Sequence, residues 1–431
     1  MDEFLITGGR PLKGKVEVGG SKNAALPILI SSILAKGEST FHRVPNLKDI
    51  QTTLQLLSQL GFRCESKSLN TIRVIETGHP ILEAPYDLVK TMRASVLVLG
   101  PLLARFRKAK VSLPGGCAIG ARPVNFHLKA FKEMGAEIDL ESGYIVASAP
   151  KGLSGARIQF EFPSVGATEN VMMAAPLAKG ETVIENAACE PEIIDLANCL
   201  RKMGAKIEGD GTPTIYIQGG HSHLSPVEYS VMGDRIEAGT FLIAGAITGG
   251  EVEVSGSANT ASEALLEKLK EAGVHLDCVD ENTIRVRSSG ELRAVSVETA
   301  PYPGFPTDMQ AQFMALMTQA KGTSEITETI FENRFMHVPE LTRLGCEISL
   351  NGRIATVKGT PGVLKGAPMM ATDLRASAGL ILAALTANGQ SRISRIYHID
   401  RGYEKIEEKL SQLGAQIERT KGPSPEGGVK R

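Results

Sequence analysis

A helical pattern that ends in an apolar residue and a glycine, and that leads into a strand-like run, occurs six times along the chain. Its glycines, spaced 69 to 74 residues apart, are Gly61, Gly135, Gly204, Gly273, Gly345 and Gly414. A glycine at this position lets the chain leave a helix through a left-handed turn and enter the next strand. So regular a spacing predicts an internal sixfold repeat.

A second helix is predicted in register with each glycine. Its expected starts carry residue types that cap the free N–H groups of a helix, at Ser21, Thr91, Ser164, Asp234, Asp308 and Asp373. Small apolar residues then follow at 24–35, 94–103, 171–177, 238–246, 311–317 and 376–384. Helices that are apolar on all sides are predicted to be buried. Amphipathic patterns at 262–271 and 404–412 predict outer helices instead.

Short runs with period-two alternation lie between the helices and predict sheets with one packed face. The candidate strands are 16–18, 72–75, 144–147, 158–162, 214–217, 251–254, 284–286, 295–297 and 355–357. One repeat is too small to fold alone. Six repeats grouped as two threes therefore predict two similar α/β domains, with a hinge near 227–233. A cleft between two like domains is the expected place for a ligand.

Composition and charge narrow the function classes. Lysine and arginine total 47 against 48 aspartates and glutamates, and this net charge of −1 predicts no recruitment to nucleic acid or to an acidic membrane. No apolar run reaches the roughly 18 residues of a membrane helix. The acidic start of the chain lacks a signal-peptide pattern, so we expect a cytoplasmic protein. Six cysteines without a CxxC pair argue against a zinc site and a disulfide framework.

Charged residues gather at the predicted starts of the buried helices, and they include Lys22, Arg93, Asp234, Arg235, Asp308, Asp373 and Arg375. Helix N-termini attract anions, and lysine or arginine there strengthens the attraction. Any one such start is typical of a solvated cap, but six equivalent starts favour a convergent polar cleft. The aspartates are suited to accepting a proton or holding a hydroxyl group. His127 is predicted to lie on a helix surface.

A glycine-rich stretch at 114–123 lies between a strand-like run and a helical pattern, and it contains Cys117 and Arg122. Glycines permit backbone conformations that are closed to other residues. A thiol beside a fixed positive charge is typical of a catalytic loop. A flexible hairpin with an incidental cysteine fits the same residue types, and these alone do not decide between the two interpretations.

Several long motifs together resemble the UDP-N-acetylglucosamine 1-carboxyvinyltransferases, a family of enolpyruvyl transferases. They are Gly-Ser-Lys-Asn-Ala-Ala-Leu-Pro at 20–27, the stretch 114–123, Phe-Glu-Asn-Arg-Phe at 331–335 and Ala-Thr-Asp-Leu-Arg at 371–375. The resemblance covers essentially the whole chain. It implies a two-domain inside-out α/β barrel, with three βαβαβ-type repeats per domain and the active site in the interdomain cleft. It also implies that residues 1–20 belong with 230–431, while 21–229 form the domain that carries Cys117.

The resemblance implies the substrates and their contacts. Phosphoenolpyruvate is expected at Lys22, Asn23, Arg122 and Arg401. The UDP-sugar is expected at Arg93, Arg122, Pro123, Val124, Asn125, Phe126, Ser164, Val165, Gly166, Asp308 and Ile330. Asp373 and Arg375 match a further active-site pair. Where the family often has aspartate, this chain has Asn125, which puts in doubt any contact that needs the aspartate charge.

The implied reaction transfers the enolpyruvyl group to the sugar 3-hydroxyl, with loss of phosphate, in the first committed step of peptidoglycan synthesis. Cys117 is the expected acid and the expected site of covalent modification by epoxides such as fosfomycin. Asp308 is the expected base, and Lys22 and Arg401 complete the catalytic set. This chemistry requires no metal or organic cofactor, and no sequence feature sets an oligomeric state. Two alternatives stay open: a shikimate-type enolpyruvyl transferase, which needs no loop cysteine, and a catalytically silent repeat protein that binds a nucleotide sugar.

Overall fold

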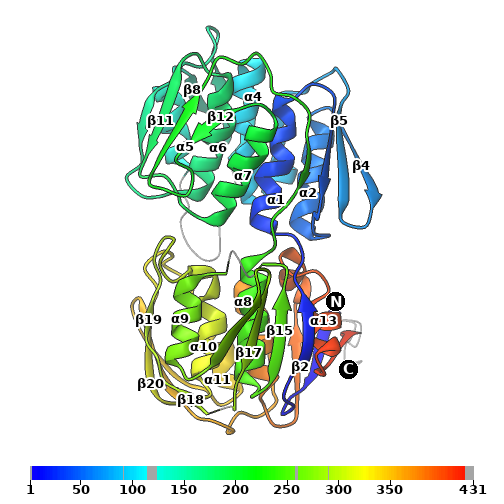
Figure 1. The fold of residues 1–431 in the computed structure, drawn as a ribbon, viewed down its shortest axis with the longest axis vertical. Coiled ribbons are helices and arrows are strands. Elements are labelled where there is room, and N and C mark those ends of the chain that lie inside the picture. Colours follow the sequence, from blue (N-terminus) through cyan, green and yellow to red (C-terminus); the bar gives the residue numbers. More distant parts are fainter. Residues whose placement is uncertain (1, 91, 114–123, 258–260, 290, 423–431) are drawn as a thin grey trace, which may run out of the picture. The chain divides into compact units, whose positions relative to one another are not determined.

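The computed structural model describes residues 2–90, 92–113, 124–257, 261–289, 291–422 of the chain (Figure 1). These residues form two compact units. The inserted unit comprises the described residues of Gly20–Cys117 and Ala121–Met232, and the terminal unit those of Met1–Gly19 and Gly233–Arg431. Each unit has a hydrophobic core of its own. The predicted Cys117, Arg122 and Pro123 lie outside the described residues.

Three four-stranded sheets form in the inserted unit, in the orders β6-β7-β9-β8, β14-β3-β5-β4 and β10-β11-β13-β12. Their strands are β3 (Glu38–His42), β4 (Phe62–Ser68), β5 (Thr71–Glu76), β6 (Glu83–Ala84), β7 (Lys108–Ser112), β8 (Glu137–Glu141), β9 (Tyr144–Ser148), β10 (Arg157–Gln159), β11 (Glu181–Glu185), β12 (Lys206–Glu208), β13 (Thr214–Gln218) and β14 (Glu228–Ser230).

The terminal unit also contains three sheets, in the orders β23-β24-β1-β25, β16-β17-β15-β2 and β18-β20-β22-β21, with β19 also paired to β20. Their strands are β1 (Asp2–Thr7), β2 (Lys13–Glu17), β15 (Glu251–Ser255), β16 (His275–Asp280), β17 (Thr283–Arg287), β18 (Leu292–Arg293), β19 (Val297–Glu298), β20 (Ala320–Thr327), β21 (Glu347–Asn351), β22 (Ile354–Gly359), β23 (Pro368–Met370), β24 (Gln390–Ser394) and β25 (Gln416–Lys421).

All six sheets have the same pattern of strand directions. Each sheet has a parallel pair at one edge, as in β6 with β7, and two antiparallel pairs beyond it, as in β7 with β9 and β9 with β8. In the sheet that contains β20, β19 adds a second parallel pair. In the terminal unit, the N-terminal segment supplies two of the strands. β1 pairs with both β24 and β25, and β2 pairs in parallel with β15. The first and last strands of the described residues are therefore neighbours in one sheet.

Buried helices lie at the centre of each unit, as the apolar runs predict. They are α1 (Lys22–Ser31), α4 (Leu99–Phe106) and α6 (Val165–Ala174) in the inserted unit, and α8 (Arg235–Ile247), α10 (Gln310–Met317) and α12 (Leu374–Ala384) in the terminal unit. Every residue of α8 and α10 is buried. In the terminal unit the three central helices contact one another. The site residues at their starts are thereby brought close together.

Amphipathic helices accompany the central ones. They are α2 (Lys48–Gln59), α5 (Asn125–Glu133), α7 (Pro191–Lys202), α9 (Glu263–Glu271), α11 (Val338–Arg343) and α13 (Ile406–Gln412), and a short α3 spans Tyr86–Val89. Each of these six helices is followed by one of the repeat glycines, with φ between +89° and +106°. These angles confirm that the repeated glycines end helices in the left-handed conformation.

Predicted helix caps are confirmed at four of the six starts. Ser21, Ser164, Asp234 and Asp373 each accept a hydrogen bond from a backbone N–H of the first turn. The prediction is wrong for Asp308, which lies inside a 3₁₀ turn, η5 (Thr307–Met309), that precedes α10. Its carboxylate forms ion pairs with two arginines instead. Thr91 lies outside the described residues. Two predicted strands are shorter than expected, because β10 ends at Gln159 and β19 begins at Val297.

Within the described residues the chain passes from one unit to the other at Gly19–Gly20 and at Met232–Gly233, and a buried carboxylate binds the backbone beside each passage. In the terminal unit, Glu237 accepts a hydrogen bond from the Gly19 N–H at 2.7 Å and forms an ion pair with Lys409 at 2.7 Å. In the inserted unit, Asp195 accepts from the Met232 N–H at 3.1 Å and from the Tyr229 hydroxyl at 2.6 Å. One passage is therefore tied to the central helix α8 and the other to the amphipathic helix α7.

Candidate functional site

Most of the predicted site residues lie at the starts of helices, and each unit holds its own set. The inserted unit carries Lys22, Asn23, Arg93, Val124, Asn125, Phe126, Ser164, Val165 and Gly166. The terminal unit carries Asp308, Ile330, Asp373, Arg375 and Arg401. The two sets are described in turn.

Lys22 and Asn23 form the first turn of α1, directly after the Ser21 cap, which accepts from the Ala24 N–H at 3.4 Å. The Lys22 ammonium lies 3.5 Å from the Asp49 carboxylate in the first turn of α2, and both side chains are largely buried. Asp49 thus orients the lysine from a neighbouring helix start. A cation held at a helix N-terminus is well placed to bind an anion.

Asn170 of α6 connects three elements of the inserted unit. Its amide nitrogen donates to the Val96 carbonyl at 3.1 Å and lies 3.0 Å from Nδ1 of His127, while its oxygen accepts from the Gly100 N–H at 2.8 Å. Because the amide nitrogen is the donor in both contacts, Nδ1 of His127 must accept, and the ring is neutral. Neither Asn170 nor this network was expected from the sequence.

His127 is buried, so the prediction that it lies on a helix surface is wrong. Burial lowers the pKa of His127 to about 4, and the positive charge of Arg93, at the start of η2 (Arg93–Val98), adds to this effect. A Cβ atom on Gly166 would lie 3.4 Å from the His127 ring, so the first turn of α6 packs closely against it. The predicted Arg93 and Gly166 are thus neighbours of one buried imidazole.

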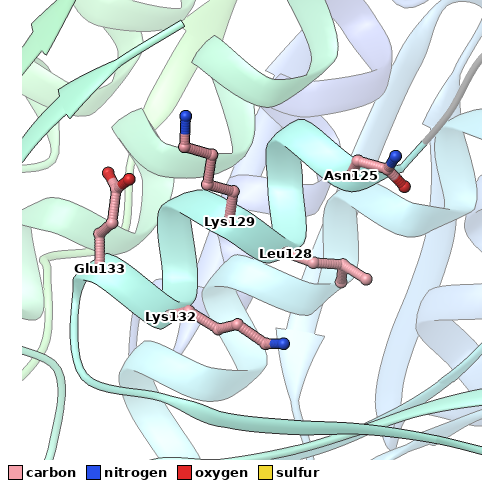
Figure 2. A pocket seen from close by; sticks show the side chains of 5 residues that line it. All are labelled: Asn125, Leu128, Lys129, Lys132 and Glu133. Atoms are coloured by element: carbon pink, nitrogen blue, oxygen red, sulfur yellow. The ribbon is translucent and has the colours of Figure 1, made fainter.

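Val124, Asn125 and Phe126 lie at the start of α5. Phe126 packs edge-on against Phe160, with ring centroids 6.1 Å apart, whereas Asn125 is exposed. A hollow of about 530 Å³ runs along the outer face of α5 and is lined by Asn125, Leu128, Lys129, Lys132 and Glu133. Figure 2 shows these five side chains projecting from the one helix. Only Asn125 among them is a predicted site residue.

Asp308 is the centre of the site in the terminal unit. One carboxylate oxygen lies 2.6 Å from the guanidinium of Arg334, and the other lies 3.1 Å from that of Arg375. Both arginine side chains are about 5% exposed, against 27% for Asp308. Two buried cations fix the orientation of this carboxylate. Arg334 was not predicted as a site residue, although it belongs to the motif at 331–335.

Glu328 holds the segment that leads to Ile330. Its carboxylate is fully buried and accepts hydrogen bonds from the hydroxyls of Thr299 and Thr307 and from the backbone N–H groups of Ile330 and Phe331. Four donors satisfy the buried charge. Glu328 therefore connects Ile330 to Thr307, the residue before Asp308, and Thr307 also receives a bond from Arg334 at 2.9 Å.

Asp373 and Arg375 begin α12. Asp373 accepts from the N–H groups of Arg375 and Ala376 at 2.9 and 3.0 Å, which caps the helix. Burial would lower the pKa of Arg375, but Asp308, Tyr403 and Asp234 outweigh this effect and raise it. Close to Asp373 lies His337, a buried residue whose pKa burial lowers to about 4. Asp308 from η5 and Asp234 from the start of α8 thus both act on the guanidinium of Arg375.

Arg401 ends the 3₁₀ turn η6 (Ile396–Arg401). The N–H groups of Gly402 and Tyr403 both donate to the Ile399 carbonyl at 3.0 Å. The Tyr403 side chain is 1% exposed and lies below Arg375, with 5.8 Å between the guanidinium carbon and the ring centre. Arg401 is thereby attached to the same helical core as Asp308.

Among the described residues, no group of three or more histidine, cysteine, aspartate or glutamate side chains could hold a metal ion. No helix within the same ranges has both the length and the apolar character needed to span a membrane.

Known proteins resemble this chain over nearly its full length. The family model described as EPSP synthase (3-phosphoshikimate 1-carboxyvinyltransferase) matches residues 6–410. UDP-N-acetylglucosamine 1-carboxyvinyltransferases are similar: that of Trichlorobacter lovleyi is 59% identical over 98% of this chain and 100% of its own, and that of Myxococcus xanthus is 56% identical over the same shares. The crystal structure of the enolpyruvyl transferase NikO from Streptomyces tendae has a TM-score of 0.87 at 25% identity, covering 98% of this chain and 99% of that one.

Proposed function

The chain belongs to the UDP-N-acetylglucosamine 1-carboxyvinyltransferase family, and we propose that it transfers the enolpyruvyl group of phosphoenolpyruvate to the 3-hydroxyl of UDP-N-acetylglucosamine. The observation that carries this proposal is identity of 55–59% to relatives of that name over almost the entire length of both chains. The product would enter peptidoglycan synthesis, and the enzyme would act in the cytoplasm on two small-molecule substrates.

The inserted unit supplies cations for the anionic substrate in this proposal. Phosphoenolpyruvate carries a phosphate and a carboxylate, and Lys22 and Asn23 at the start of α1 provide an ammonium and an amide at the positive end of a helix. Arg122 in the stretch 114–123 adds a second cation, and Arg401 of the terminal unit a third. The neighbourhood of Arg93, Ser164 and Gly166 would hold the UDP-sugar.

The reaction is an addition followed by an elimination. The sugar oxygen bonds to C2 of the enol, its proton passes to Asp308, and the Cys117 thiol protonates C3. The tetrahedral adduct then loses phosphate from C2 and returns a proton from C3 to the Cys117 thiolate, which restores the double bond and the thiol. Arg334 and Arg375 support this role because they fix the direction of the Asp308 carboxylate. In this proposal Asp308 takes the proton as the hydroxyl oxygen bonds to C2.

The residues of this mechanism come from both units, so the proposal includes an active site in a cleft that closes on the substrates. The glycine pattern and the six sheets of like topology support a pair of three-repeat barrels. Small-angle scattering tests the closure: UDP-N-acetylglucosamine should decrease the radius of gyration. An unchanged radius would contradict closure without touching the chemistry.

A single assay tests the function against its alternatives. Purified protein is mixed with phosphoenolpyruvate and either UDP-N-acetylglucosamine or shikimate 3-phosphate, and phosphate release is measured. We expect release with the UDP-sugar alone. Release with shikimate 3-phosphate would favour the shikimate-type enzyme. Binding of the UDP-sugar without release from either mixture would favour the silent binding protein.

A further inference from the structure

Tyr403 occupies the centre of the terminal unit, where α8, α10 and α12 meet. It is among the largest fully buried side chains of the protein. Its hydroxyl lies 2.8 Å from Thr240 Oγ1 of α8 and 3.2 Å from Gln312 Nε2 of α10. Its ring faces the guanidinium of Arg375 on α12. One side chain therefore contacts all three central helices.

The directions of these hydrogen bonds follow from the available protons. Thr240 donates its hydroxyl proton to the Ile236 carbonyl at 2.8 Å, so its oxygen must accept from the phenol of Tyr403. The Gln312 amide nitrogen has two protons, and its nearest oxygen acceptors are the Asp308 backbone carbonyl at 3.0 Å and the Tyr403 oxygen at 3.2 Å. The phenol thus accepts one bond and donates one. Burial raises its pKa, which keeps it protonated.

Two routes lead from Tyr403 to Asp308. The first passes through Gln312, which joins the phenol to the Asp308 backbone carbonyl. The second passes through Arg375, which lies over the ring and pairs with the Asp308 carboxylate at 3.1 Å. Both the backbone and the side chain of Asp308 are therefore coupled to the position of one buried ring.

Tyr403 also fixes the segment that bears Arg401, two residues earlier. Its N–H closes the end of η6, and between the two residues Gly402 packs against Leu374 so closely that a Cβ atom would lie 2.6 Å from a Leu374 methyl carbon. Real Cβ contacts are essentially never that short, so this part of the chain has little freedom to move.

We propose that Tyr403 is a positioning residue, which sets Asp308 and Arg401 at a fixed separation through Gln312, Arg375 and the end of η6. This inference rests on the proposed function, because it assigns Asp308 and Arg401 to one reaction. Tyr403 touches no substrate in this proposal. Its effect should therefore appear in the turnover rate rather than in the affinity for the nucleotide sugar.

The test compares Tyr403→Phe and Gln312→Met with the wild-type protein. Tyr403→Phe keeps the ring below Arg375 but removes the acceptor of one Gln312 N–H, and Gln312→Met removes the amide at similar length. We expect each change to lower kcat by about tenfold or more, since a misplacement of about 1 Å can cost about 10²-fold. Calorimetric affinity for UDP-N-acetylglucosamine should stay within twofold of wild type. The double variant should be no more than about twofold slower than either single variant, since both break one route.

Thr318→Val provides the matched control. Thr318 is a buried residue directly after α10, at the opposite end from Asp308, and its hydroxyl donates to the Ala315 carbonyl. Loss of this hydroxyl should lower the unfolding temperature about as much as Tyr403→Phe does, and it should leave kcat unchanged. Three outcomes would overturn the inference. The kcat of Tyr403→Phe could stay within twofold of wild type, the kcat of Thr318→Val could fall as far as that of Tyr403→Phe, or the two single losses of kcat could multiply in the double variant. A wild-type protein that releases no phosphate would overturn the proposed function, and the inference with it.

Discussion

The inserted and terminal units have sheets of the same topology but opposite chemistry at the starts of their central helices. Serine caps α1 and α6 in the inserted unit, and Lys22 and Arg93 lie beside these starts. Aspartate caps α8 and α12 in the terminal unit, and Asp308 precedes α10. The fold thus decides where the site residues lie, while the residue at each start decides the sign of the local charge.

The physical consequence follows from the helix dipole. A helix N-terminus carries about half a positive charge, which a serine cap leaves in place and an aspartate cap offsets. The inserted unit therefore adds cations to positive helix ends and suits anionic groups. The terminal unit combines carboxylates with Arg334 and Arg375, and so presents an oriented carboxylate. The two units thus share one sheet topology, but their helix starts suit different chemical groups.

The largest expected effect comes from Cys117, which the proposed mechanism makes the proton donor. Cys117→Ser should abolish turnover, because a serine hydroxyl is a far weaker acid and nucleophile, while UDP-sugar binding measured by calorimetry remains. Cys117→Asp should retain some turnover and resist epoxides that mimic phosphoenolpyruvate, because a carboxylate forms no stable thioether.

Mass spectrometry after epoxide treatment of the wild-type protein should place one adduct on the peptide with Cys117. Burial raises the pKa of Cys199 and Cys346 to about 12 and that of Cys64 to about 11, so these thiols should stay unmodified. Cys278 is exposed, so the expectation that all the other thiols are buried is wrong for it. An adduct on Cys64, Cys189, Cys199, Cys278 or Cys346 instead of Cys117, or full activity of Cys117→Ser, would remove this loop from the mechanism.

A second prediction concerns the ion pairs of the terminal unit. Asp308→Ala leaves Arg334 and Arg375 buried without their shared carboxylate, so we expect the free energy of unfolding to fall by about 3 kcal/mol and kcat to fall about 10³-fold. Urea unfolding and phosphate release measure the two effects. The matched change in the inserted unit is Asp49→Ala, which removes one partner 3.5 Å from Lys22. An equal loss of stability in both variants would contradict the contrast between the units.

Acid should destabilise the inserted unit through His127. The folded pKa of about 4 lies below the unfolded value of about 6.5. The unfolded state therefore binds more protons between these pH values, and stability present above pH 6.5 is lost as the pH falls toward 4. Between pH 7 and pH 5 we expect a loss of about 2 kcal/mol.

Urea unfolding of His127→Asn over that pH range checks the assignment, because the variant lacks the titrating ring and should lose less stability. His337→Asn makes the same measurement in the terminal unit, where burial also lowers the histidine pKa. Identical pH dependence of wild type and His127→Asn would rule out the buried imidazole as the cause.

The smallest expected effect tests the cap rule itself. Ser164→Asp gives α6 the type of cap found in the terminal unit, so the helix should keep its stability to within about 0.5 kcal/mol. The added negative charge should weaken UDP-N-acetylglucosamine binding about tenfold, or about 1.4 kcal/mol. Ser164→Asn, a neutral cap of similar size, is the control. Equal affinities of the two variants would show that the charge at this start does not select the ligand.

Local patterns in the sequence determined much of the fold. The central helices are apolar on all sides, and the burial of such a run can be predicted without knowing which elements pack against it. The six repeat glycines end helices because the left-handed conformation at a helix end favours glycine in any context. The helix caps at Ser21, Ser164, Asp234 and Asp373 likewise depend only on residues within four positions of the cap. The motifs also brought Asp308 and Arg375 forward as site residues.

Only the tertiary structure decided how distant residues combine. Asp308 is paired with arginines 26 and 67 positions away, so it cannot act as the cap that its place in the repeat predicts. His127 is buried by contact with Asn170, 43 positions away, and no local pattern distinguishes it from a surface histidine. β1 joins a sheet with the last strand, β25, across almost the whole chain. These contacts depend on packing between elements, and the physical reason that periodicity missed them is that it reports only which face of an element is apolar.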